Sequence, residues 1–107
     1  ISRDDLRIIA NVVRYHRKSL PTSSHSSYSS LRREQRMQVS KLASLLRIAD
    51  ALDRGHAQRV RSVEVEVTEG DVILHCEYTG DISIERYGFS GKANMFEEVF
   101  GLNVIIA

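Results

Sequence analysis

Apolar residues recur every three or four positions along the first part of the chain, which predicts a helix from Ser2 to about Lys18. Asp5 stands three residues after Ser2, at the spacing of a capping box, and Asp4 and Asp5 suit the positive end of the helix dipole. Pro21 disfavours helical geometry at the residue before it, so this helix must end before the proline.

The next twelve residues, 19–30, contain seven serines and predict a surface segment. This segment is either a solvated connector or a loop that contacts phosphate. A long second helix is expected from about Arg32 to Arg54, because it carries a wide apolar stripe that includes Val39, Leu42, Leu46 and Ala49. Gly55 is the expected end of this helix, since glycine accepts the left-handed conformation that closes helices.

From residue 62 the period of the pattern changes from helical to alternating. Alternation predicts three strands, over residues 62–67, 72–78 and 82–86, joined by tight turns. Residues 92–100 then read as a short helix that ends at Gly101, and residues 102–107 as a last strand. We therefore predict an α+β fold: two main helices in residues 1–60, followed in residues 61–107 by a β-β-β-α-β unit with a largely antiparallel sheet, one side covered by its helix.

The composition, 42% hydrophobic and 27% charged, is that of a soluble globular chain, and no apolar run is long enough to cross a membrane. A single cysteine, Cys76, cannot form an internal disulfide. We expect a cytoplasmic location on this ground.

The charge is unevenly distributed. Residues 1–61 hold 13 Lys and Arg against 5 Asp and Glu, a net charge of +8, whereas residues 62–107 hold 2 against 9, a net charge of −7. Such an asymmetry indicates either a first half that attracts anions or two faces that dock on each other, within the chain or across a dimer.

Two acidic residues in the second helix have arginines at helical contact spacing. Arg47 and Asp50 are three residues apart, Asp50 and Arg54 are four apart, and Asp53 lies beside them. These four residues form either an ion-pair network that anchors the helix or part of a metal site, because a lone buried carboxylate is costly.

The stretch RYHRKSLP gathers Arg14, His16, Arg17 and Lys18 at the end of the first helix. Cations are favoured at a helix C-terminus by the dipole alone. A cluster with several hydrogen-bond donors also suits phosphate.

These stretches together carry a resemblance. IANVVRYHRKSLP, LASLLRIADALDRGH and FEEVFG occur in an order that resembles the C-terminal region of the Ppx/GppA family of exopolyphosphatases and guanosine pentaphosphate phosphohydrolases. The resemblance implies that residues 1–60 are the second part of an HD-like helical domain and residues 61–107 the small terminal α/β domain. It also implies two actin-like catalytic domains, with a divalent cation such as Mg²⁺, elsewhere in the enzyme and without a counterpart in this sequence.

The resemblance further implies homodimerisation and a positively charged channel for polyphosphate. The residues we expect to contact polyphosphate are Arg14, His16, Arg17, Lys18, Arg32, Arg33 and Arg36. Asp50 stands where the HD pattern has its last aspartate, and His16 resembles a histidine of some members, but the His-Asp pair of that pattern is missing. We therefore expect no metal site in this chain, with His16 and Asp50 as the only candidate ligands.

Two other functions are compatible with the sequence. The chain is alternatively a piece of an HD-type metal-dependent phosphohydrolase that acts on nucleotides, or a basic nucleic-acid-binding module. The second alternative has little material for base stacking, because the chain contains seven aromatic residues with no interleaved pattern in its basic half.

Overall fold

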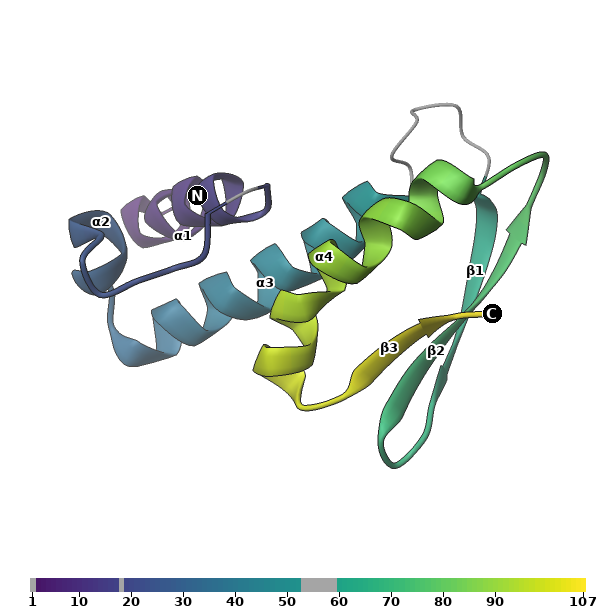
Figure 1. The fold of residues 1–107 in the computed structure, drawn as a ribbon. Coiled ribbons are helices and arrows are strands. Elements are labelled where there is room, and N and C mark those ends of the chain that lie inside the picture. The colour runs from purple at the N-terminus through teal and green to yellow at the C-terminus, as the bar shows by residue number, and fades with distance from the viewer. Residues whose placement is uncertain (1, 18, 53–59) are drawn as a thin grey trace.

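The computed structural model describes residues 2–17, 19–52 and 60–107 (Figure 1). The predicted α+β class is confirmed, because helices come first and a three-stranded sheet closes the chain. The elements are α1 (Arg3–Tyr15), α2 (Ser26–Ser29), α3 (Arg33–Leu52), β1 (Val60–Val67), β2 (Asp71–Tyr78), α4 (Ser83–Phe100) and β3 (Asn103–Ile106).

Helix α1 begins with the predicted capping box. The Ser2 hydroxyl accepts a hydrogen bond from the Asp5 amide at 3.0 Å, and the Asp5 carboxylate accepts one from the Ser2 amide at 3.4 Å. The helix ends at Tyr15, a little earlier than predicted, and the serine-rich segment contains one helical turn, α2. The segment is therefore a surface connector with a short folded piece.

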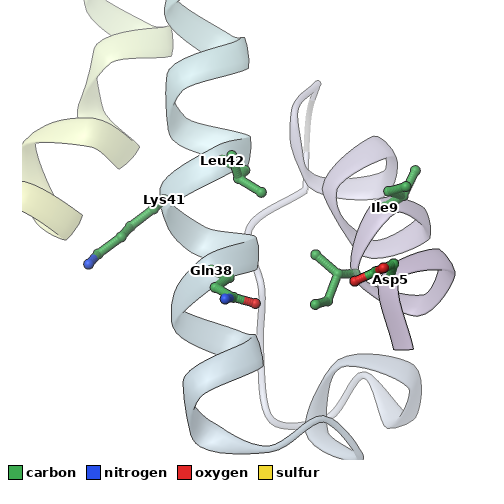
Figure 2. Close-up of a pocket in the computed structure, with 6 residues that line it drawn as sticks. Asp5, Ile9, Gln38, Lys41 and Leu42 are labelled. Atoms are coloured by element: carbon green, nitrogen blue, oxygen red, sulfur yellow. The ribbon is translucent and has the colours of Figure 1, made fainter. Parts of the chain in front are cut away.

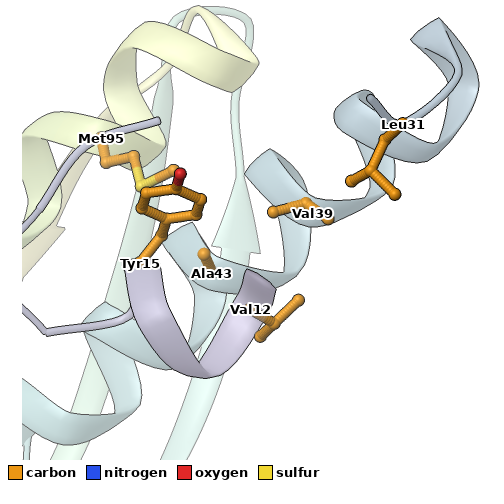
Figure 3. Packing of buried hydrophobic residues seen from close by; sticks show 6 residues of the cluster. All are labelled: Val12, Tyr15, Leu31, Val39, Ala43 and Met95. Atoms are coloured by element: carbon orange, nitrogen blue, oxygen red, sulfur yellow. The ribbon is translucent and has the colours of Figure 1, made fainter. Parts of the chain in front are cut away.

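Helix α3 is the longest element and lies between α1 and α4 (Figure 1). Its buried residues Val39 and Ala43 meet Val12 and Tyr15 of α1 on one side, and Met95 of α4 joins the same cluster (Figure 3). The wide apolar stripe read from the sequence is explained by this packing on more than one side. Its predicted end at Gly55 lies outside the described residues.

The sheet has the order β1-β2-β3, with β1 antiparallel and β3 parallel to β2. Val72 and Leu74 of β2 are buried against Phe89, Ala93 and Phe96 of α4. The prediction that a helix covers the apolar side of the sheet is confirmed. The sheet is mixed rather than largely antiparallel, because only one of its two pairings is antiparallel.

The predicted strand over residues 82–86 is wrong, since Ser83 already begins α4. The alternation of apolar residues there is short, whereas the buried positions Ile82, Glu85 and Phe89 follow helical spacing. Asp81 starts the helix by accepting a hydrogen bond from the Ser83 amide at 2.9 Å. The order of the second part is therefore β-β-α-β.

The end of α4 agrees with the sequence. Gly101 follows the last helical residue with φ of 69°, a left-handed conformation that glycine adopts without a steric penalty. No helix within the described residues is long and apolar enough to cross a membrane.

Replacing Met95 with alanine tests the contact between α4 and the α1–α3 cluster. Met95 is 4% exposed and Met37 of α3 is 46% exposed, so the same truncation removes buried contacts only at residue 95. We expect Met95→Ala to lower the free energy of unfolding by about 2 to 5 kcal/mol and Met37→Ala to change it by about 0.5 kcal/mol or less. Urea unfolding followed by circular dichroism measures both; equal losses would show that α4 does not share this core.

Candidate anion-binding site

Several backbone carbonyls in the C-terminal turn of α1 have hydrogen-bond donors. The His16 amide donates to Val12 O at 3.0 Å, and His16 Nδ1 donates to Val13 O at 2.7 Å. Since a carbonyl only accepts, Nδ1 carries the hydrogen, and Nε2 is left as the ring atom that can meet a ligand. Nε2 donates to an anion only when the imidazole is protonated.

Arg47 of α3 donates hydrogen bonds to the residues at and after the end of α1. Its Nε donates to Tyr15 O at 2.7 Å and its Nη2 to Ser19 O at 2.6 Å. The side chain is 5% exposed, and burial lowers the pKa of its guanidinium from the usual value. Arg47 is therefore a buried cation with two of its donors on carbonyls at and just beyond the end of another helix.

Lys92 of α4 adds a third contact to the same turn. Its Nζ donates to Arg17 O at 2.6 Å, across 75 residues of sequence. Sequence reasoning missed this residue, because no local spacing relates α4 to the end of α1. The turn is thus held by α3 and by α4 together.

The side chains predicted to contact phosphate in this region reach solvent. Arg14 and Arg17 are exposed, and His16 is half-buried. The guanidinium carbon of Arg14 lies 5.3 Å from the centre of the Tyr15 ring, a cation–π distance that steadies an exposed side chain. Lys18, the fourth predicted member, lies outside the described residues.

A second basic group lies at the start of α3. Arg32 and Arg33 are exposed, while Arg36 is half-buried and donates to Leu31 O. Arg7 of α1 approaches the same end by donating to Ser30 Oγ at 2.8 Å. The sequence analysis did not include Arg7 among the phosphate-contacting residues. The one feature of the sequence that could have indicated it is its position on the helix face opposite the apolar stripe.

The two basic groups are linked by α3. Arg36 and Arg47 are eleven residues apart, which is close to three full turns, so they lie on one face of the helix about 17 Å apart along its axis. Because Arg47 holds the end of α1, the six predicted residues that the structure describes lie in two groups rather than in one cluster.

The predicted network around Asp50 is only partly described. Asp50 is half-buried, Arg47 donates to the carbonyls at the end of α1, and Asp53 and Arg54 lie outside the described residues. The network therefore stays a prediction. The described residues contain no group of three His, Cys, Asp or Glu side chains suited to a metal, so we derive no metal-dependent step from His16 or Asp50.

The acidic half of the chain is separate from these groups. The sheet lies at the opposite end of α3 from α2 (Figure 1), and its Glu64 and Glu66 are exposed. Glu66 accepts from His75 Nε2 across the β1–β2 pair at 2.9 Å. Arg14 and Arg17 are exposed as well, so these members of the basic and acidic faces do not cover each other within the chain.

The groove between α1 and α3 is a different kind of surface (Figure 2). Its cavity of about 580 Å³ is lined by Asp5, Ile8, Ile9, Gln38, Lys41 and Leu42, and Lys41 is directed away from α1. None of the six predicted residues within the described part of the chain lines it. Its mainly apolar lining suits packing rather than phosphate binding.

Tyr15 connects the end of α1 to the serine-rich segment through a hydrogen bond and ring stacking with His25. Its side chain is fully buried, its hydroxyl lies 2.7 Å from His25 Nδ1, and the two rings are stacked with their centres 5.6 Å apart. Burial raises the pKa of the Tyr15 hydroxyl, while the nearby Arg14 charge opposes this shift. The site thus rests on a neutral, hydrogen-bonded tyrosine.

The chain was compared with profiles of known protein families and with curated proteins. The profile of Ppx/GppA phosphatase, domain III, matches residues 1–83, which include α1, α2, α3 and the β1–β2 hairpin. A search of curated proteins returned no match.

Tyr15→Phe tests the role of this hydroxyl and the direction of its pKa shift. We expect a loss of about 1 kcal/mol in the free energy of unfolding near pH 7, because one hydrogen bond is removed. Because the pKa is raised in the folded state, wild-type stability is retained below the unfolded pKa of about 10 and falls as the pH rises above it. The variant should lose less stability over that alkaline interval.

Urea unfolding at neutral and alkaline pH measures both effects. Tyr87→Phe is the control, since Tyr87 is 90% exposed. An alkaline loss in Tyr15→Phe as steep as that of wild type would contradict the assignment.

Proposed function

Because the chain belongs to the Ppx/GppA phosphatase family, we propose that it is the part of an exopolyphosphatase that holds inorganic polyphosphate. Bond cleavage belongs to the catalytic domains of the enzyme, with their divalent cation. The chain's own contribution is to retain the polyanion between cleavage events.

The observation that carries this proposal is the pair of basic groups along α3. One group is formed by Arg14, His16 and Arg17 at the end of α1, and the other by the arginines at the start of α3. Arg36 of the second group and Arg47, which holds the turn that carries the first group, lie about 17 Å apart along α3. This spacing suits a chain of several phosphate units better than a single small anion. Contacts at two places raise the retention of one polymer without new chemistry.

Arginine is suited to this task. Its planar guanidinium donates to two phosphate oxygens at once, and it stays charged at any physiological pH. The acidic sheet lies away from both groups, so it does not neutralise them. A polyanion therefore meets a locally positive surface despite the net charge of only +1.

We also propose that the chain forms a homodimer through β1. Val65 and Val67 are 61% and 65% exposed, and they pair with Leu74 and Val72 of β2, which α4 buries. Paired residues of neighbouring strands point to one face. The apolar face of the sheet therefore extends beyond α4 and is available to a second copy.

Removal of two exposed arginines tests polyphosphate binding. We expect Arg14→Ala combined with Arg17→Ala to weaken binding of long-chain polyphosphate by about tenfold or more, since each arginine supplies charge-assisted hydrogen bonds. Binding is measured by fluorescence competition at fixed salt. Arg61→Ala combined with Arg86→Ala removes the same charge from the sheet end and should have little effect.

Equal loss in the two double variants would mean general charge attraction and would count against the site. Competition with DNA at matched salt separates polyphosphate binding from nucleic-acid binding, because simple charge attraction does not distinguish polyanions. Stronger binding of DNA would favour the nucleic-acid module.

Val65→Glu tests the dimer. We expect the variant to remain folded but to shift the monomer–dimer equilibrium towards monomer by about tenfold or more, because a charge would be buried in the interface. Sedimentation velocity over a range of concentrations measures this, with Thr79→Glu as an exposed control of equal charge. A wild-type chain that stays monomeric at every concentration contradicts the proposal.

A further inference from the structure

The turn after α1 has an unusual backbone arrangement. Three alternate carbonyls, those of Tyr15, Arg17 and Ser19, each accept a hydrogen bond from a cationic side chain, at 2.6 to 2.7 Å. Two of these bonds come from Arg47 and one from Lys92. No acidic side chain takes part in these three bonds.

This arrangement changes the electrostatics at the C-terminus of α1. The C-terminus of a helix carries a partial negative charge from its unpaired carbonyls, so it normally repels anions. Here Arg47, Lys92 and the His16 ring cover carbonyls of the last turn and of the residues after it. These bonds offset the negative charge of the helix end and so reduce its repulsion of an anion.

We propose that Arg47 is a positioning residue for this anion site. It fixes the turn from its buried side by holding Tyr15 O and Ser19 O, so that His16 and Arg17 are presented to phosphate on the outer side. The inference rests on the proposed function, because it assigns a role within that same site. Arg47 itself is 5% exposed and acts through the turn rather than by contact with the ligand.

The geometry requires arginine rather than any cation. Nε and Nη2 are held in a rigid plane, and each reaches a different carbonyl, four residues apart in sequence. The single ammonium of a lysine on a flexible stem does not reproduce this fork. Arg47→Lys therefore keeps the positive charge and removes the fixed geometry.

The experiment compares Arg47→Lys with wild type at a temperature where circular dichroism shows both to be fully folded. We expect affinity for long-chain polyphosphate to fall by about tenfold, because a displaced turn would cost Arg17 about one charge-assisted hydrogen bond to phosphate. We also expect a smaller slope of log affinity against log salt, since fewer phosphates are contacted at once. A purely structural role would lower the unfolding midpoint and leave the affinity and the salt slope of the folded protein unchanged.

Lys92→Met keeps the test decisive if Arg47→Lys fails to fold. It removes the bond to Arg17 O, whereas the control Lys41→Met removes the same charge from the exposed side of α3 that faces away from α1 (Figure 2). We expect Lys92→Met to weaken polyphosphate binding several-fold more than Lys41→Met. Equal effects of these two variants, or an unchanged affinity in folded Arg47→Lys, overturn the inference.

The two proposals fail in different ways. If wild type does not bind long-chain polyphosphate, or if the Arg14→Ala, Arg17→Ala variant binds it as well as wild type does, the proposed function is wrong and the inference falls with it. If that double variant loses binding while folded Arg47→Lys retains it, only the positioning role is wrong.

Discussion

The buried guanidinium of Arg47 is the contact on which the basic end of the molecule depends. A charged group removed from water is stable only when its donors are satisfied, and two backbone carbonyls at the end of α1 satisfy two of them here. The same bonds supply partners for carbonyls that a helix end otherwise leaves unpaired. One side chain of α3 thus ties the last residue of α1 to the segment that follows it.

Much of the fold was predictable because the signals were local. The capping box at Ser2, the helical period of α3 and the left-handed Gly101 each depend on residues a few positions apart. The strand predicted over residues 82–86 failed because the apolar alternation there is short, whereas the buried positions Ile82, Glu85 and Phe89 follow helical spacing. The packing of Phe89 and Phe96 against the sheet, which the sequence does not display, favours the helix further.

The sequence predicts which residues form the candidate site, and that prediction stays open, whereas it does not show how the fold positions them. Spacing rules for helices relate a residue to its neighbours three and four positions away, so they assigned Arg47 to Asp50. The printed sequence holds no signal that Arg47 reaches residues 15 and 19, or that Lys92 reaches residue 17. Contacts of this kind depend on how α1, α3 and α4 pack, which is a property of the whole fold.

The packing also explains why the two ends of the chain belong together. Met95 and Lys92 lie in α4, which covers the sheet with its Phe89 and Phe96 and, between these two residues, contacts the end of α1. The sheet therefore sets the position of α4, and α4 helps to set the position of the turn after α1. A basic surface that retains a polyanion needs such packing beneath it, because the positions of exposed arginines depend on the backbone that carries them.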